Sequence, residues 1–390
     1  MSHPPLLTRQ FWLLALSNFL FSASFQMIIP ELPAMLSAMG GKAYIGYLIT
    51  LFTVTAGLAR PFSGKLADRI GRVPIMALGS VTCFVCSLLY PSVHSVTAFL
   101  LLRLFHGLST GTKPTATMAY VADVAPEARR GEAAGLLGIF TAVGMSAGPA
   151  LGGWLAGVSL QAMFYTSAAF ALLSILCLGR LRETLPNPER FRLRMLRIGW
   201  QDVYEPRVLG PALVMLLLSF STGVVLILVP DHSLRIGLTN KGLFFTVYTL
   251  ASLCVRLFGA KIPDRYGRTP VLLISSAVLA VSLFMLAVSS HPAVFFAAAL
   301  VYGAAWGLNS PTLTAWTVDL SHPEFRGRAM ATLFVALEAG IGLGAWLAGW
   351  LYGGLNGPIA LLYVLSGLAA CAASGYLLWF RIKPRAVRAV

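Results

Sequence analysis

Twelve long apolar runs, separated by short polar segments, dominate this sequence of 390 residues. Each run is close to the roughly 20 residues that an α-helix needs to span a ~30 Å hydrocarbon core. Only 11% of the residues are charged and 57% are hydrophobic, which leaves too little polar surface for a soluble globular domain. We therefore expect an all-α membrane protein with twelve transmembrane helices, near residues 11–33, 44–62, 74–91, 95–119, 132–156, 160–180, 208–230, 241–260, 270–289, 292–317, 329–353 and 357–380.

The net charge of +15 is explained by where the basic residues lie. If both termini are on one side of the membrane, that side carries 24 of the 29 Lys and Arg residues, and the other side carries Lys42, Arg235 and Lys241. The positive-inside rule then predicts that both termini are cytoplasmic. The basicity therefore indicates topology, not a nucleic-acid partner, and we expect a multi-pass protein of a bacterial inner (plasma) membrane.

The first apolar run follows Arg9 and has the length of a signal peptide, but eleven further runs favour a retained helix. The five cysteines all fall inside apolar runs, where they behave as small hydrophobic residues. The sequence therefore predicts neither a metal site nor a cofactor.

One charged phrase occurs twice, as GKLADRIGR at residues 64–72 and as AKIPDRYGR at residues 260–268. The same offset of 196 residues relates Arg60 to Arg256 and Asp123 to Asp319. Such parallel repeats predict two related six-helix bundles, residues 1–185 and 207–390, joined by a cytoplasmic linker at 186–206. The linker is polar and basic, and its hydrophobic spacing leaves two possibilities open: an amphipathic helix on the membrane surface or a solvated connector.

These motifs resemble those of the major facilitator superfamily over essentially the whole chain. GKLADRIGR resembles the loop between helices 2 and 3 of that family, and AKIPDRYGR resembles its second copy. LLRLFHGLSTG (101–111) resembles the helix 4 motif of proton-coupled members, GMSAGPALGG (144–153) resembles the helix 5 motif of exporters, and IIPELP (28–33) resembles the end of helix 1 in twelve-helix drug/proton antiporters. Three departures stand out: Val73 replaces a basic residue, Ala260 replaces a glycine, and the second half has Gly344-Ala345 where the first has Gly-Pro.

The repeated loops predict a conformational latch. Asp68 is placed to cap the positive N-terminus of the eleventh helix across the bundle interface, an interaction worth ~0.3–2 kcal/mol. Gly71 allows a tight turn, and Arg72 can reach lipid phosphate or Asp123. The alternative is that these charges only set topology. The expected latch residues are Gly64, Asp68, Arg69, Gly71, Arg72, Asp123, Asp264, Arg265 and Arg268.

Small residues leave one face of the fifth run nearly bare: Gly144, Gly148, Pro149, Gly152 and Gly153. Small residues at four-residue spacing permit close helix packing in membranes, and Pro149 frees a carbonyl and bends the helix. The alternatives are ordinary packing and, as the resemblance implies, a tight outer contact that limits leak in an exporter.

The fourth run carries polar residues every three to four positions, including Arg103, His106, Thr110 and Lys113, which therefore share one helix face. A charge at mid-membrane costs at least ~2.5–3.5 kcal/mol, so Arg103 is expected to face a wet cavity or a partner. Lys113 lies nearer the inner boundary and can snorkel. The expected substrate cavity comprises Asn18, Ser22, Gln26, Arg103, His106, Thr110, Lys113, Tyr302, Trp306, Asn309 and Glu338.

Glu338 is the only acid deep inside an apolar run. Burial favours a protonated carboxyl and a nearby arginine favours the carboxylate, so we expect Glu338 to carry the coupled proton together with Arg103 and His106. The alternative is a buried ion pair that holds helices together. Glu31 and Asp231 lie at outer helix ends, where solvated gate charges are expected.

Taken together, the residues and the resemblance predict a proton-coupled secondary active exporter (antiporter) of small amphipathic molecules such as drugs, working by alternating access as a monomer among membrane lipids. The sequence has no G-x-S-x-G, H-E-x-x-H or phosphate-loop motif, so an enzyme is not expected. One alternative is a dedicated exporter or importer of an anionic or zwitterionic metabolite such as a sugar or siderophore. Another is a membrane sensor that transports nothing.

Overall fold

The computed structural model describes residues 8–125, 130–197, 199, 204–259, 261–321, 326–352 and 359–382. Within these ranges the chain forms twelve long helices and the short helices α2 (Leu32–Ala38) and α10 (Ile262–Tyr266). The long helices are α1 (Arg9–Ile28), α3 (Tyr47–Ile70), α4 (Arg72–Leu89), α5 (Val96–Val124), α6 (Arg130–Val158), α7 (Leu160–Leu178), α8 (Leu209–Arg235), α9 (Leu243–Gly259), α11 (Arg268–Val288), α12 (Pro292–Leu320), α13 (Arg326–Leu351) and α14 (Ile359–Ile382).

Ten of the described helical segments are long and apolar enough to cross a membrane, and α1 with α2 makes one of them. The other two long helices, α5 and α9, pack among these spans: α5 against α3 and α4, and α9 against α6 and α12. Polar residues such as Arg103, His106 and Lys113 lower the hydropathy of α5, and α9 is apolar but only 17 residues long. The expected all-α membrane fold is confirmed.

Polar caps mark where several of these apolar helices begin. Thr8, Ser95 and Ser159 precede α1, α5 and α7, and each side-chain oxygen accepts a hydrogen bond from the backbone N–H three residues later. These bonds satisfy donors that the first helical turn leaves free. Short polar residues therefore set the boundaries that hydropathy alone places only approximately.

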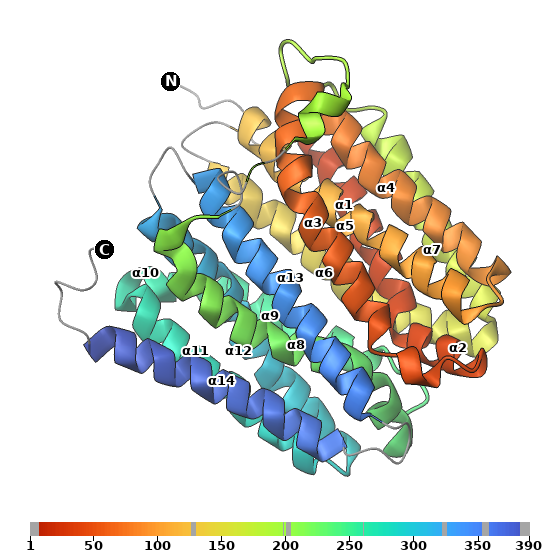
Figure 1. Cartoon of the computed structure of the whole chain (residues 1–390), viewed down its shortest axis with the longest axis vertical. Helices are drawn as coiled ribbons and strands as arrows, with labels where there is room; N and C mark the ends of the chain where they lie inside the picture. Colours follow the sequence, from red (N-terminus) through yellow and green to blue (C-terminus); the bar gives the residue numbers. More distant parts are fainter. Residues whose placement is uncertain are drawn as a thin grey trace.

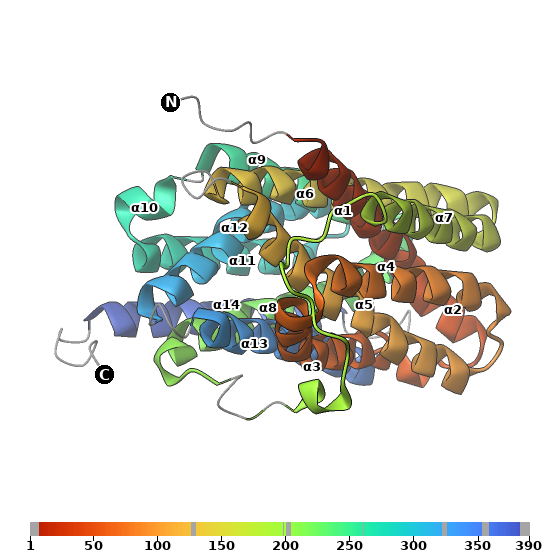
Figure 2. The same cartoon turned by 90° about the horizontal axis from the view of Figure 1, so that it is seen from above.

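The N-terminal helices α1–α7 and the C-terminal helices α8–α14 form two bundles side by side (Figures 1 and 2). The bundles meet along two helix pairs, α3 with α13 and α6 with α9. We call the end of the molecule that carries the turns at Gly71 and Gly267 the linker end, because the connection between the halves lies there, and the opposite end the far end.

The described part of the linker is bonded to both halves at this end. The backbone N–H of Glu189 donates to the carbonyl of Arg69 at 2.7 Å, and Lys65 Nζ donates to the carbonyl of Arg197 at 2.6 Å. Its described residues form only single 3-10 turns, Leu193–Leu196 and Pro206–Val208, so the amphipathic helix considered from the sequence does not form there.

Glu205 ties the end of the linker to α13. Its carboxylate accepts a hydrogen bond from Arg328 Nε at 2.9 Å, and its backbone N–H donates to Thr332 Oγ1 at 2.9 Å. Burial raises the pKa of this carboxyl, but hydrogen bonds and charges from Arg328 and Arg207 outweigh burial, so the pKa lies below its ordinary value. Glu205 is therefore held as a carboxylate that anchors the linker.

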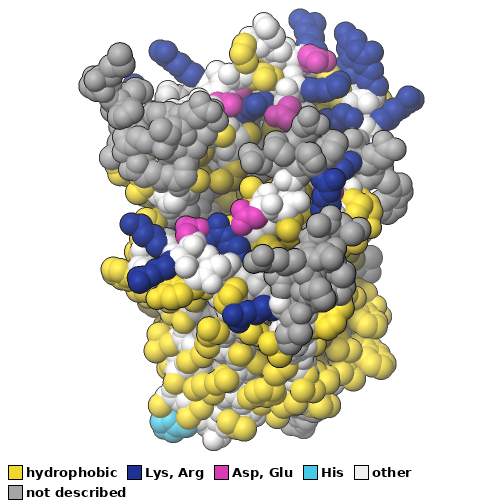
Figure 3. All heavy atoms as spheres, turned by 90° about the vertical axis from the view of Figure 1, so that its left-hand side faces the viewer, with side chains coloured by type: hydrophobic (Ala, Val, Ile, Leu, Met, Phe, Trp, Pro, Cys, Tyr) yellow, Lys and Arg dark blue, Asp and Glu magenta, His cyan; other side chains and the backbone are white. Residues whose placement is uncertain are grey.

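Charged side chains are separated from the apolar surface along the length of the molecule. Figure 3 shows Lys and Arg side chains gathered on the upper part of one face, with hydrophobic side chains covering its lower part. This separation is what a protein needs when most of its length lies in hydrocarbon.

The two halves touch closely at the far end. Near α3 and α13, a Cβ added to Gly349 would lie 2.2 Å from Gly46 Cα, and near α6 and α9, one added to Gly242 would lie 1.9 Å from the carbonyl oxygen of Pro149. Only glycine permits such backbone contact.

A crevice of about 820 Å³ separates the halves at the linker end. One wall is formed by Ala134, Gly135 and Gly138 of α6, and the other by α9, α10 and α12 with Arg256 among the lining residues. The halves are therefore in backbone contact at the far end and are separated by this crevice at the linker end.

Candidate functional site

A central cavity of about 260 Å³ lies between the two halves. Aromatic and hydroxyl side chains make up much of its wall, and its charged residues are two arginines and one glutamate. The lining residues are Phe25, Gln26, Ile29, Ile49, Phe52, Thr53, Arg60, Arg103, Thr110, Met145, Thr222, Val225, Leu226, Phe245, Tyr248, Thr249, Tyr302, Leu337, Glu338 and Ile341. An apolar wall with a few polar groups is typical of a small-molecule site.

Arg60 and Glu338 form an ion pair in this cavity. Arg60 on α3 donates to one carboxylate oxygen, Glu338 Oε1, from Nε at 3.1 Å and from Nη2 at 2.6 Å. The two side chains are only 14% and 9% exposed, and the guanidinium also lies over the Phe334 ring. Because α3 and α13 belong to different halves, this pair joins the two bundles through charge.

Arg103 has no such partner. Its side chain is 1% exposed, its Nε donates to the carbonyl of Leu48 at 2.9 Å, and its guanidinium lies 4.5 Å from the centroid of the Phe52 ring. Nη1 is 3.4 Å from the hydroxyl of Tyr90, and the buried Nη2 donates to no described residue. In this conformation Arg60, and not Arg103, holds the Glu338 carboxylate, and the shared role of Arg103 and Glu338 in proton coupling stays a prediction.

His106 lies behind Arg103 and does not line the central cavity. It is fully buried, its Nδ1 is 3.3 Å from the Tyr90 hydroxyl, and its ring packs edge-on against Phe52. His106 thus supports the residues that hold Arg103.

Lys113 does not lie where the sequence predicts. It neither snorkels to the surface nor lines the cavity, because it is fully buried inside the N-terminal half. Its Nζ donates to the hydroxyl oxygens of Ser17 at 2.9 Å, Ser80 at 3.0 Å and Ser174 at 2.6 Å, and it lies over the Phe21 ring. The lysine therefore joins α1, α4 and α7 to α5.

The remaining predicted cavity residues divide into two groups. Gln26, Thr110 and Tyr302 line the cavity, and the Tyr302 hydroxyl lies 3.2 Å from both Ser221 Oγ and Thr222 Oγ1. Four do not line it: Asn18, whose amide donates to Thr141; Ser22, which faces Gly144; Trp306; and Asn309, which accepts from Ser275 Oγ. These four side chains are instead buried among the helices outside the cavity.

The small residues of α6 contact two different parts of the molecule, helix α1 and the other half. A Cβ added to Gly144, Gly148 or Gly152 would meet backbone oxygens of α1 at 2.5, 2.6 and 2.0 Å. Gly153 and Pro149 instead meet the other half: a Cβ on Gly153 would lie 2.1 Å from Asn240 Oδ1, and Asn240 also donates to the carbonyl of Ala150.

The charged turns have the same geometry in both halves. Arg72 Nε is 3.0 Å from Asp123 Oδ2, and Arg72 Nη1 is 3.2 Å from Asp68 Oδ1. In the second copy, Arg268 Nε is 3.0 Å from Asp319 Oδ2, and Arg268 also pairs with Asp264. Each triad lies within one half.

In this conformation Asp68 is exposed and pairs with Arg72. The segment before α13, where it was expected to act as a cap, lies outside the described residues, as does Ala260. A Cβ added to Gly64 would make only an ordinary van der Waals contact, with Thr115. The carbonyl of Arg69 accepts a hydrogen bond from the linker. The guanidinium of Arg265 lies over the Tyr266 ring.

Gly71 is required for two reasons. Its φ is +127°, and a Cβ there would lie 2.6 Å from the Glu183 carboxylate, which accepts hydrogen bonds from the backbone N–H groups of Arg72 and Val73. Glu183 thereby caps α4, a role that the sequence analysis missed.

The two outer acids differ in exposure, because Glu31 is buried and Asp231 is half-buried. Glu31 is 6% exposed and accepts from Lys241 Nζ at 2.5 Å, and Asp231 accepts from the Tyr352 hydroxyl at 2.8 Å. The Glu31–Lys241 pair joins the two halves at the far end, so the expectation of a solvated gate charge is wrong for Glu31.

Arg60 is the charged cavity residue that the sequence does not single out, because it lies next to the basic loop. The depths of the two residues below the linker end of their helices would have indicated the pair. Arg60 lies ten residues, about 15 Å, before the end of α3, and Glu338 lies twelve residues, about 18 Å, after the start of α13, so the two side chains are at similar depths.

The fold and the site define a membrane transporter built from two repeated bundles. The model of the Major Facilitator Superfamily matches residues 14–230 and 211–390, and the chain belongs to this superfamily. Its relatives and structural neighbours in this family are transporters, not enzymes.

Two curated relatives match parts of the chain. Multidrug resistance protein 1 of Bacillus subtilis (strain 168) is 29% identical over 197 residues, which is 50% of each chain. Quinolone resistance protein NorA of Staphylococcus aureus (strain MRSA252) is 24% identical over 256 residues, or 63% of this chain and 66% of NorA. The matched segments thus span between half and just under two thirds of these relatives.

Solved structures share the fold along nearly the whole chain. The human organic anion transporter MFSD10 (TETRAN) has a TM-score of 0.74 at 19% identity, covering 96% of this chain and 100% of the other. The partially occluded, inward-open xylose transporter XylE from E. coli has a TM-score of 0.75 at 16% identity, covering 96% and 97%. At these identities the likeness concerns the fold.

Proposed function

We propose that this transporter is a proton-coupled exporter of small amphipathic molecules and that Glu338 carries the coupled proton. The observation that carries the proposal is the Arg60–Glu338 pair, which lies in the central cavity and joins the two halves. Among the described lining residues, Glu338 is the only acid.

The pair couples protonation to the movement of the halves. When the halves rock apart along α3 and α13, Arg60 leaves Glu338, and a buried carboxylate without its cation is costly. Uptake of a proton removes that cost, and its release lets the pair form again. A proton gradient then drives the cycle in one direction, by alternating access.

The curated relatives support export as the direction, since both are named for resistance to drugs. The basic linker end, which carries most of the Lys and Arg residues, is proposed to face the cytoplasm of a bacterial cell. The crevice at that end is then the cytoplasmic entrance of a monomeric transporter.

The test is transport by the full chain in liposomes under an imposed pH gradient, with ethidium as the probe. We expect Glu338→Gln to lose most of the gradient-dependent transport, by about tenfold or more, because glutamine takes up no proton at this position. Glu189→Gln, an exposed acid of the linker, is the matched control and is expected to transport normally. Full gradient dependence in Glu338→Gln would overturn the assignment.

A second candidate function is transport of an anionic or zwitterionic metabolite. Arg103 favours it, because this buried guanidinium has one nitrogen without a described acceptor. The test is binding of an aromatic carboxylate to purified protein. Binding that salt weakens and that falls at least about tenfold in Arg103→Ala would support it, whereas equal binding by both proteins would reject it.

A further inference from the structure

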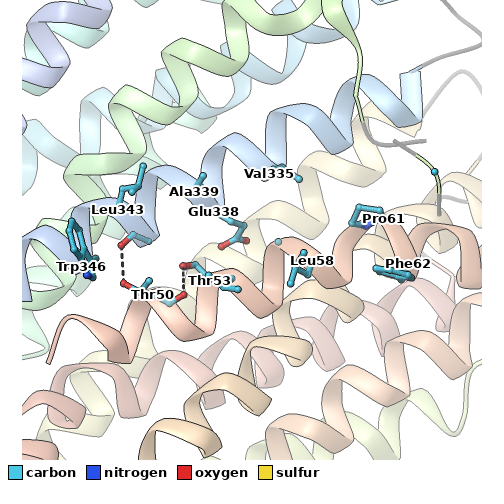
Figure 4. A pocket seen from close by; sticks show the side chains of 14 residues that line it. Thr50, Thr53, Leu58, Pro61, Phe62, Val335, Glu338, Ala339, Leu343 and Trp346 are labelled. Carbon is cyan, nitrogen blue, oxygen red and sulfur yellow. Dashed lines mark hydrogen bonds between the residues drawn. The ribbon is translucent and has the colours of Figure 1, made fainter. Parts of the chain in front are cut away.

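A groove of about 660 Å³ runs between α3 and α13 on the surface of the bundle. In Figure 4, Trp346 lies toward one end, Pro61 and Phe62 lie toward the other, and Glu338 lies between them. Its volume is in the range of pockets that bind small molecules.

The groove faces hydrocarbon. Its walls include Val54, Leu58, Val335 and Leu343, of which Leu58 is 65% exposed and Leu343 is 50% exposed. Both helices belong to membrane-spanning segments, so these exposed apolar side chains lie against lipid tails.

The groove adjoins the central cavity. Thr53 and Glu338 line both spaces. Helices α3 and α13 lie close together at this point: a Cβ added to Gly57 would lie 3.3 Å from Glu338 Cβ, and one added to Gly342 would lie 2.7 Å from Thr53 Oγ1.

Where the groove adjoins the central cavity, several oxygen atoms are available as hydrogen-bond acceptors. Arg60 binds only Oε1 of Glu338, and Oε2 accepts no hydrogen bond from any described residue. The hydroxyl of Thr53 donates to the carbonyl of Thr50, which leaves its oxygen as an acceptor. Pro61 has no N–H to offer the carbonyl of Gly57 one turn earlier.

These features occur at only one of the two helix pairs that join the halves. At an offset of 196 residues, Leu253 replaces Gly57, Leu257 replaces Pro61 and Ala142 replaces Glu338. A feature that the repeat does not preserve is not required by the shared scaffold.

We infer that this groove is a lateral binding site and entrance for a membrane-dissolved amphiphile with an ammonium head. The apolar tail lies against Leu58, Val335 and Leu343, and the head donates hydrogen bonds to Glu338 Oε2 and neighbouring oxygens. The inference rests on the proposed transport function and adds a route: the ligand enters sideways from the bilayer.

The probe is dodecylammonium that carries a diazirine near the end of its tail, added to the full chain in liposomes without any gradient. Light is expected to produce adducts on α3 and α13 groove residues, located by mass spectrometry, that excess dodecylammonium suppresses. Glu338→Gln should weaken this saturable labelling by about tenfold, as expected for loss of a charge-assisted hydrogen bond. A probe with a carboxylate head should label the groove no more than other lipid-facing surfaces.

Ala339→Trp fills the groove and is expected to lower its saturable adducts by at least about tenfold. Val335→Trp fills the same groove from its exposed edge, and it serves as the test variant if Ala339→Trp does not fold. Ala372→Trp adds the same bulk to the exposed surface of α14 and should leave groove labelling unchanged.

Any of three results would overturn the inference. The adducts could be distributed evenly over all lipid-facing helices, the labelling could be unchanged in both filling variants, or the probe with the carboxylate head could label the groove equally. Because labelling needs no gradient, saturable groove adducts in a protein that shows no gradient-driven transport would reject the exporter and retain the lateral site. Gradient-driven transport with unsaturable labelling would reject the lateral site alone.

Discussion

Arg60 and Arg256 occupy equivalent positions in the two halves, but their surroundings differ. Arg60 faces Glu338, whereas Ala142 stands at the position equivalent to that acid. Arg256 lines the crevice at the linker end and forms no ion pair with any residue in the described ranges. One member of the repeated pair has therefore become part of the cavity.

This difference predicts unequal effects of the same substitution. Arg60→Ala leaves the Glu338 carboxylate buried without its cation, and removing one partner of a buried pair typically costs ~3–5 kcal/mol. We expect a clear fall in the melting temperature of the purified protein and weaker gradient-driven transport. Arg256→Ala should change the stability by less than about 1 kcal/mol. Equal melting temperatures for the two variants would contradict this account.

At this scale the sequence allowed a partial prediction of the site. Arg103 and Glu338 were found because an intramembrane charge is costly wherever it lies. Their partners were not found, because a partner depends on which helices meet across the bundle. Lys113 illustrates this: its cage comes from Ser17, Ser80 and Ser174, three serines on three helices with no shared motif.

Among the helices, α6 contains glycines of two kinds. Gly144, Gly148 and Gly152 meet the backbone of α1, while Gly157 on the same helix has nothing within 4 Å of an added Cβ. The sequence predicted the bare face from its spacing, but not that α1 covers most of it and that the other half contacts the remainder.

Gly152→Ala and Gly157→Ala test this division. The Cβ at residue 152 would lie 2.0 Å from the carbonyl oxygen of Met27, a backbone atom that cannot turn aside. We expect Gly152→Ala to lower the free energy of unfolding by ~1–3 kcal/mol, as overpacking does. Gly157→Ala should be neutral or stabilising by up to ~1 kcal/mol, because alanine favours helix. Denaturation by SDS titration measures both, and a more stable Gly152→Ala variant would show that the helices are not in close contact.

For the whole molecule, the choice of conformation depends on contacts between the halves. At the far end these include the Glu31–Lys241 pair, Thr50 Oγ1 donating to the carbonyl of Gly342 at 2.9 Å, and Thr246 Oγ1 donating to the carbonyl of Ser146 at 2.8 Å. The all-α fold and its two bundles were predictable from span count and repeats. Which end of the molecule is separated was not predictable from the sequence, because a conformation separated at either end uses the same helices and the same buried faces.

Lys241→Ala is expected to open the far end. The side chains of Glu31 and Lys241 are 8% and 13% exposed, so removing the cation leaves a nearly buried carboxylate. A loss of 1.4 kcal/mol would already raise the open population about tenfold. Spin labels at the exposed positions Tyr44→Cys and Thr239→Cys, with Cys254 and Cys371 replaced by serine, report the distance between the halves at this end.

Lys42→Ala, an exposed lysine at the same end, is the matched control for that measurement. We expect a longer label-to-label distance to gain population in Lys241→Ala and not in Lys42→Ala. Identical distance distributions would mean that the backbone contacts alone keep the far end closed.

Those backbone contacts have a mechanical consequence. Gly46 with Gly349 and Gly242 with Pro149 touch on two different helix pairs, and two fixed points define a line. A rigid half that keeps both points has one remaining degree of freedom, rotation about that line. Helix α3 then acts as a lever about 36 Å long. Small angular changes at the glycines become large displacements at the linker end, and exposing the cavity to the opposite side requires the axis itself to be released.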